Sequence, residues 1–319
     1  MKRLQTELLI ILIIIWILAI VALLLAKDPY FMFIITMANY YALLAISWNL
    51  LAGYTGQLSF GHTGLLAIGG YGSVYFVMLT GLPPALGMIV GSVLATLTGL
   101  GLGWICLRLK GIYLALTTFA FSAIIMLLLL SEYKVTGGRA GIRTKFLLYE
   151  PPYTIGLYYY FIGLAILALC LITTRWLIRS KYGLFFEAIR EDEDAAAIYG
   201  LNIVRLKLLA FVISSFWVGL AGGFYAHLIG YISPAVADLS IMAMILTMTI
   251  LGGLGSLFGP LIGGLVVWPL LEFIRSYSAT LQQLIFAFAI IISLKFFRNG
   301  FIGLINSAIE RYRKSQVTS

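Results

Sequence analysis

The chain has 319 residues, of which 62% are hydrophobic and only 10% are charged, and its formal net charge is +9. Soluble domains carry about a quarter charged residues, so a chain this apolar could not cover a surface that faces water. The positive charge does not indicate nucleic-acid binding, because the Lys and Arg residues are spread over several short connections, as in the cytoplasmic loops of membrane proteins. Since no charged residue occurs between Pro29 and Leu107, we expect most of the chain to lie in lipid.

The apolar segments predict membrane-spanning helices. Lipid offers no hydrogen bonds to the backbone, so a spanning segment must be a helix or part of a closed barrel. Barrel strands alternate apolar and polar residues, and these segments do not. The sequence therefore predicts an all-α, polytopic transmembrane helical bundle with about 8–10 spans, including interrupted or re-entrant helices. In chain order the expected spans are 8–26, 31–51, 63–79, 86–107, 111–130, 156–176, 208–229, 241–271 and 281–297.

The positive residues between the spans predict the orientation of the chain. Four groups are read as cytoplasmic: Lys2 with Arg3, Arg108 with Lys110, the segment 175–207, and the tail with Arg311, Arg313 and Lys314. Both termini are then cytoplasmic, and 131–155 is an external loop. This arrangement requires 241–271 to cross an even number of times. Because Gly and Pro residues fill its middle, we expect a re-entrant hairpin or two short helices there.

Two glycine-rich, uncharged segments interrupt the apolar runs. The segments 49–62 and 253–259 share a Gly-x-Leu-(x)-Phe-Gly core. Paired Gly-interrupted segments in the two halves of a transporter point to its translocation pathway, while close helix packing explains the glycines equally well. The pathway candidates are Asn49, Gln57, Ser59, His62, Gly253 and Gly255.

Ionisable groups are almost absent from the expected spans. No carboxylate or cysteine lies near His62 at the spacing of metal ligands, so we expect this side chain to hydrogen-bond a neighbouring carbonyl. We find no pattern elsewhere in the sequence that would bring together a nucleophile and a base, or a set of metal ligands. Neither a catalytic residue nor a metal site is therefore predicted. Transporters driven by ion gradients usually need intramembrane Asp, Glu or His residues, which indicates that energy enters this chain from elsewhere.

One polar helical segment stands out between the spans, within the expected cytoplasmic loop 177–207. Glu187, Arg190, Glu191 and Asp194 follow i, i+3, i+4 and i+7 spacing, which predicts one charged face on a helix over 184–200. Gly200 is a natural C-terminal stop. The residues alone leave two interpretations open, a docking helix for a soluble partner and a solvated connector. Adjacent acidic residues on a helix do not converge, so no metal site is expected there.

Several long motifs resemble permease subunits of branched-chain amino-acid ABC importers, in the LivM-like branch. The similarity lies in the segments 47–62, 108–116, 136–142 and 183–258. The resemblance implies a single transmembrane permease domain over 1–319 in a prokaryotic plasma (inner) membrane. It also implies a cytoplasmic "EAA-x-x-x-G" coupling helix, which the run from Asp194 to Gly200 matches with Asp in place of Glu. The coupling residues are then Glu187, Arg190, Asp194, Ala195, Ala196 and Gly200.

The resemblance further implies partners for this chain. These are a second related permease subunit, two cytoplasmic ATP-binding subunits and an external solute-binding protein. The sequence has no G-x-x-x-x-G-K-[ST] motif, so ATP and Mg are expected on the partner ATPases and no cofactor on this chain. The implied function is translocation of branched-chain or other hydrophobic amino acids. A permease for urea or short amides, and an ion-coupled secondary transporter, remain alternatives.

Overall fold

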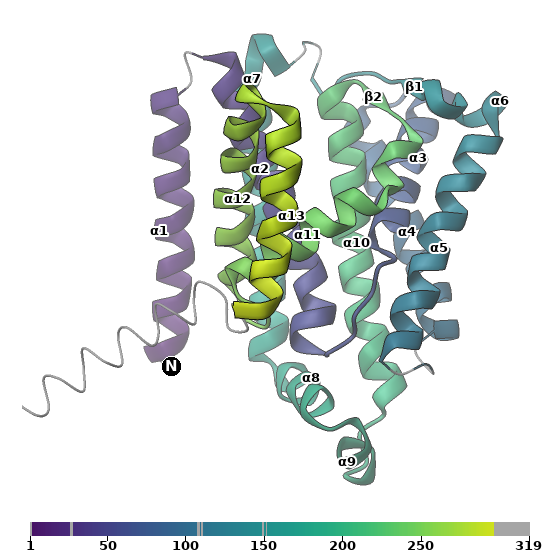
Figure 1. Cartoon of the computed structure of the whole chain (residues 1–319), viewed down its shortest axis with the longest axis vertical. Helices are drawn as coiled ribbons and strands as arrows, with labels where there is room; N and C mark the ends of the chain where they lie inside the picture. Colours follow the sequence, from purple (N-terminus) through teal and green to yellow (C-terminus); the bar gives the residue numbers. More distant parts are fainter. Residues whose placement is uncertain are drawn as a thin grey trace, which may run out of the picture.

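The structure, a computed structural model, describes residues 2–25, 28–106, 109, 111–148, 150 and 152–296. Almost all of this part is helical (Figure 1), which confirms the all-α prediction. The longer helices are α1 (Lys2–Leu25), α2 (Pro29–Asn49), α3 (His62–Thr80), α4 (Pro84–Cys106), α5 (Ile112–Ser131), α7 (Pro152–Arg179), α10 (Ile203–Ile229), α11 (Leu239–Gly252), α12 (Gly259–Tyr277) and α13 (Ala279–Phe296). The shorter elements are a π-helical turn (Leu50–Tyr54), α6 (Tyr133–Thr136), α8 (Lys181–Glu191), α9 (Glu193–Ile198), two 3₁₀ turns (Gly138–Ala140 and Pro234–Ala237), and the strands β1 (Ile142–Arg143) and β2 (Tyr231–Ile232).

Six helical segments in the described part are long and apolar enough to cross a membrane. They are α2 with its π-helical turn, α3, α4, α5, the segment Gly156–Arg179 of α7, and α10. Two further apolar stretches, Ile11–Leu24 and α11, are shorter. The chain is therefore a multi-pass membrane protein. The total of about 8–10 spans stays a prediction.

Close contacts between glycines hold α3, α4 and α10 together. A Cβ added to Gly69 would lie 2.4 Å from the Cα of Gly219 in α10, and one added to Gly91 in α4 would lie 2.1 Å from the carbonyl oxygen of Gly69. Small residues allow helix backbones to approach this closely, which is how helices pack in lipid. These glycines, which lie outside the two glycine-rich breaks, thus allow close helix packing.

Two hydrogen bonds between side chains show how α3 and α10 run relative to each other. His62 Nε2 lies 2.8 Å from Ser214 Oγ, and Ser73 Oγ lies 2.9 Å from His227 Nε2. Both pairs advance in the same direction along the two helices, so α3 and α10 run parallel. On the other side of the core, α2 packs against α12, where the ring of Tyr41 stacks on that of Trp268 with centroids 4.3 Å apart.

The connections between helices gather at two opposite ends of the bundle (Figure 1). Residue 2, the end of α4, the start of α5 and the α8–α9 segment lie at one end, which we call the α8 end. The antiparallel strands β1 and β2 lie at the other end, which we call the β1–β2 end. These positions agree with the predicted grouping, although Arg108, Lys110, Arg311, Arg313 and Lys314 lie outside the described residues. Which end faces the cytoplasm stays a prediction.

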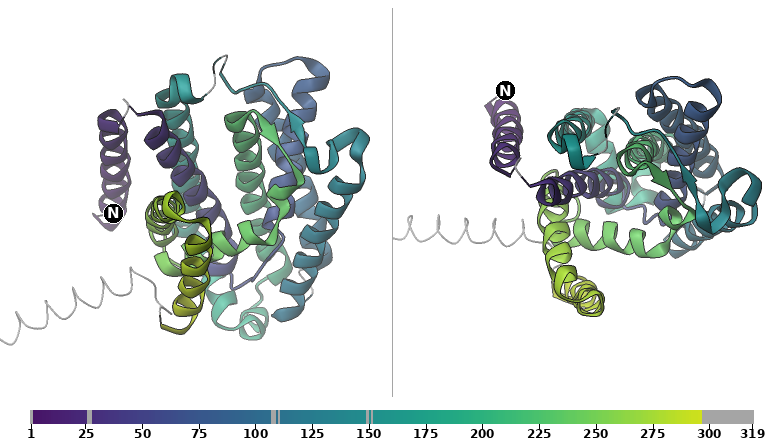
Figure 2. Two further views of the ribbon diagram at one scale, coloured as in Figure 1. Left: turned by 45° about the horizontal axis from the view of Figure 1, so that its top comes forward. Right: turned by 90° about the horizontal axis from the view of Figure 1, so that it is seen from above.

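The expected break within 241–271 is confirmed. Helix α11 ends at Gly252, α12 begins at Gly259, and Ser256 Oγ closes the turn by donating to the Gly253 carbonyl at 2.7 Å and accepting from the Gly259 N–H at 3.0 Å. Seen from above, α11 lies across the bundle while α10 is viewed nearly end-on (Figure 2). The two helices form a hairpin, because a Cβ on Gly263 would lie 1.8 Å from the carbonyl oxygen of Met248.

Candidate functional site

The polar segment at the α8 end is two helices, so the single helix predicted over 184–200 is wrong. The backbone at Asp192 is extended, with φ −155° and ψ 107°. Its carboxylate accepts hydrogen bonds from the backbone N–H groups of Asp194 and Ala195, each at 3.0 Å, and so caps the start of α9. The turn between the helices removes Asp194 from the face that carries Glu187 and Arg190.

The predicted end of the segment at Gly200 is confirmed. Gly200 adopts a φ of +84°, a conformation that favours glycine. The Leu201 N–H reaches back to the Ala196 carbonyl at 3.2 Å, as in helix ends closed by a left-handed residue. Ala196 is buried against the bundle, whereas the neighbouring Tyr199 is 87% exposed. Helix α9 therefore packs through its alanine side and presents its end to solvent.

A buried ion pair ties α9 to α10. Lys207 Nζ lies 2.7 Å from Glu193 Oε2, and the two side chains are 5% and 27% exposed. Neither residue was a candidate from the sequence. The signal that could have found the pair is the isolated lysine among apolar residues in the run Leu206–Phe211, because a buried ammonium needs a partner.

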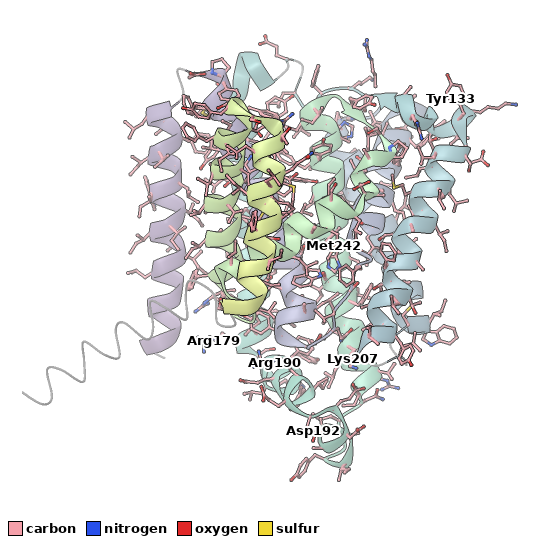
Figure 3. The ribbon with its side chains drawn as sticks, viewed as in Figure 1. Tyr133, Arg179, Arg190, Asp192, Lys207 and Met242 are labelled. Atoms are coloured by element: carbon pink, nitrogen blue, oxygen red, sulfur yellow. The ribbon has the colours of Figure 1, made fainter. Side chains whose placement is uncertain are left out.

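Arg190 of α8 binds the first glycine break. Its Nη1 donates to the carbonyl oxygen of Gly53 at 2.9 Å, and its Nη2 pairs with Glu191 at 3.0 Å. The same guanidinium lies against the second break, since a Cβ on Gly255 would be 2.8 Å from Nη1. Figure 3 shows Arg190 where α8 meets the bundle, with Asp192 farther out at the start of α9.

Asn49 joins the two breaks to each other. Its Nδ2 donates to the Ser256 carbonyl at 2.9 Å, and its Oδ1 accepts from the Gly255 N–H at 2.8 Å. The side chain is 1% exposed. The amide thus pairs with the backbone of a segment more than 200 residues away, where main-chain groups would otherwise be unsatisfied. The structure therefore brings Asn49, Gly255 and Arg190 into one cluster, with Gly253 at the start of the same turn.

Residues 30–294 match the model of a family described as branched-chain amino acid transport system / permease component. The chain belongs to this permease family.

The permease is also similar to curated relatives. It is 31% identical over 271 residues to LivM of Escherichia coli K12, a high-affinity branched-chain amino acid transport system permease protein, and the match covers 77% of this chain and 64% of the relative. It is 27% identical over 280 residues to LivH of the same strain, covering 81% of this chain and 89% of the relative. The fructose import permease FrcC of Rhizobium meliloti is 26% identical over 212 residues, covering 60% and 56%.

The permease thus spans less than two thirds of the length of the LivM relatives it matches. No solved structure matches the chain.

The remaining candidates in the first break of the permease make hydrogen bonds of their own. His62 is fully buried, and its Nε2 donates to Ser214 Oγ, because the Ser214 hydroxyl proton is already committed to the Ser47 carbonyl at 2.6 Å. We expected His62 to hydrogen-bond a carbonyl directly. It instead donates to Ser214, whose hydroxyl donates to the Ser47 carbonyl. In the described part of the chain no group of three or more His, Cys, Asp or Glu residues could hold a metal ion.

Ser59 and Gln57 shape the segment that leads from the break to α3. Ser59 Oγ accepts from the Gly61 N–H at 3.2 Å, and its carbonyl accepts from Trp48 Nε1 at 2.7 Å. Gln57 Nε2 donates to Thr55 Oγ1 at 3.0 Å. Both side chains are buried, so in this conformation they fix the backbone of the segment.

Proposed function

We propose that this permease is one half of the membrane channel of an ATP-driven importer for branched-chain or other hydrophobic amino acids. A second related permease subunit completes the channel, and an external solute-binding protein delivers the amino acid at the β1–β2 end. Two ATP-binding subunits, which hold ATP and Mg, dock on α8 and α9 from the cytoplasm of a prokaryotic cell. Membership of the family and the printed activities of LivM and LivH support this proposal.

The proposed mechanism depends on the hydrogen bond that Arg190 donates to the Gly53 carbonyl. Helix α8 touches the first break through this hydrogen bond, and Asn49 transmits any displacement to the second break through two more. A shift of α8 on ATP binding then moves both breaks together. Because the breaks lie where α2 ends and where α11 turns into α12, their joint movement changes access to the pathway through the bundle.

Replacing Arg190 tests this mechanism. We expect Arg190→Gln, in the complex reconstituted into vesicles, to lower ATP-driven uptake about tenfold while ATP hydrolysis continues. Loss of a hydrogen bond from a charged donor costs about 1.5–3 kcal/mol, and tenfold corresponds to about 1.4 kcal/mol. Arg205→Gln is the matched control, since Arg205 is an exposed cation at the same end. Normal coupled uptake by Arg190→Gln would refute the mechanism.

The substrate class is tested in the same vesicles. We expect uptake of leucine, isoleucine and valine to require both ATP and the solute-binding protein. Fructose and urea should neither be carried nor compete. Uptake driven by an ion gradient without ATP would instead establish a secondary transporter, and uptake of urea alone would establish a permease for short amides.

The buried polar residues of the first break are proposed to support the pathway. We expect Gln57→Ala and His62→Ala each to impair uptake while the complex still assembles, because each removes a hydrogen bond that holds the 55–62 segment or α3 in place. Unchanged uptake by both variants would remove Gln57 and His62 from the pathway.

A further inference from the structure

A cavity of about 220 Å³ lies at the α8 end, beside several of the residues whose contacts are described above. Its wall combines charged, polar and apolar side chains from α5, α8, α9, α10 and the segment after the first break. Six of them matter here: Gln57, Leu114, Ile189, Arg190, Glu193 and Lys207. Since one water needs about 10–15 Å³ of such space, the cavity exceeds the need of a single water or ion. It is smaller than the roughly 300–1,000 Å³ typical of sites for drug-sized ligands.

Gln57, one of the residues of this wall, has one acceptor that its hydrogen bonds leave unused. The Thr55 hydroxyl donates to the Leu51 carbonyl at 2.8 Å, so its oxygen can only accept from Gln57 Nε2. This fixes the orientation of the amide. The Gln57 Oε1 atom then has no hydrogen-bond partner among the described residues, although it is buried. A buried acceptor without a donor costs free energy, but neighbouring atoms cover this one, so a donor reaches it only after the wall opens.

The charges around the cavity have both signs. Lys207 and Arg190 supply cationic donors, while Glu193 supplies a carboxylate. A simple anion such as phosphate would find the two cations but would also face the Glu193 carboxylate. A zwitterion suits charges of both signs, since its carboxylate can pair with Arg190 and Lys207 and its ammonium with Glu193. Leu114 and Ile189 complete the wall with apolar surface for a branched side chain.

We propose that this cavity binds one molecule of the transported amino acid from the α8 side, and that the bound molecule slows further transport cycles. The inference rests on the proposed function, which supplies the amino acid on that side. A ligand in the cavity contacts α8 through Arg190, α9 through Glu193 and α10 through Lys207. It therefore holds together the three helices that must move when α8 shifts, and accumulated product limits its own import.

The test uses the complete complex in vesicles. Added ATP is hydrolysed only by complexes whose α8 end faces outward, so amino acids added to the same solution reach the cavity. We expect L-leucine to reduce ATP hydrolysis by half or more. Isocaproate, which lacks the ammonium, and isoamylamine, which lacks the carboxylate, should be at least tenfold weaker. No effect of leucine, or an equal effect of isocaproate or inorganic phosphate, overturns the proposal.

Filling the cavity gives the second measurement. We expect Leu114→Phe to raise the leucine concentration for half inhibition at least tenfold, while Leu116→Phe on the exposed side of the same helix leaves it unchanged. If Leu114→Phe does not assemble, Ile189→Ala enlarges the site and should shift inhibition from leucine toward phenylalanine. Unchanged inhibition in every variant that assembles overturns the proposal. Uptake by the unaltered complex is measured in parallel, and its absence would refute the proposed function instead.

Discussion

The two glycine breaks can touch because Gly53 has no side chain. A Cβ on Gly53 would lie 2.0 Å from Asn49 Oδ1 and 2.6 Å from the Gly255 backbone nitrogen. Real atoms do not approach so closely, so glycine at this position is required by the neighbour and not by its own backbone angles. The close approach is what lets one amide side chain hydrogen-bond both Gly255 and Ser256.

We expect Gly53→Ala to separate the two breaks. The added methyl group displaces the Asn49 side chain, and loss of its two hydrogen bonds costs about 1–3 kcal/mol. The melting temperature of the purified permease should fall. Uptake by the complex should also fall, by more than the loss of folded protein explains. Gly101→Ala is the matched control, because nothing lies within 4 Å of its added Cβ. Equal behaviour of the two variants would mean that the breaks do not need this contact.

At the scale of elements, the junction of α8 and α9 is set by a cap. Asp192 ends one helix and starts the next, and α9 has only six residues, too few for a stable isolated helix. Its stability therefore comes from the Asp192 cap, from the packing of Ala196 and from the ion pair between Glu193 and Lys207.

Removing the cap should loosen α9 without changing the spanning helices. We expect Asp192→Ala to cost about 1 kcal/mol of helix stability, whereas Asp192→Asn keeps most of it because both Asp and Asn are good caps. Hydrogen exchange of the amides in 193–198 should become about fivefold faster in the alanine variant. Exchange that is unchanged there would show that packing alone holds α9.

The ion pair between α9 and α10 makes a separate prediction. Glu193→Gln leaves the Lys207 ammonium buried without a counter-charge, which costs up to about 3–5 kcal/mol. Lys207→Met alone should be destabilising to a smaller extent, because Glu193 is more exposed. The double variant should recover part of the loss, since no uncompensated charge remains. Strictly additive changes in unfolding free energy across the cycle would contradict a direct interaction.

At the scale of the whole molecule, composition and the required number of membrane crossings predict the features that depend on average properties of long segments. The helical bundle, the hairpin within 241–271 and the stop at Gly200 follow from apolar length, from Gly and Pro content and from sidedness. The contact of Asn49 with Gly255 does not follow, because it joins segments 206 positions apart and depends on tertiary packing. The break at Asp192 was missed because local capping competes with helix continuation inside an acidic run.

The hairpin of α11 and α12 decides on which side of the membrane the end of α12 lies. Since α11 turns back at 253–258, α12 returns to the β1–β2 end, and α13 crosses again (Figure 1). Single cysteines can test this arrangement at exposed positions near both ends of the bundle: Leu82, Tyr199 and Tyr277, which are 41%, 87% and 74% exposed. The native Cys106 and Cys170 are buried and give little background.

We expect a membrane-impermeant thiol reagent to label Leu82→Cys and Tyr277→Cys from outside intact cells, and Tyr199→Cys only after the membrane is opened. Leu82 lies between α3 and α4 at the β1–β2 end, so it serves as the reference for that side. Tyr277 follows the hairpin and reports on it alone. Labelling of Tyr277→Cys together with Tyr199→Cys would mean that 241–271 crosses an odd number of times. Labelling of Tyr199→Cys from outside would reverse the orientation of the whole bundle.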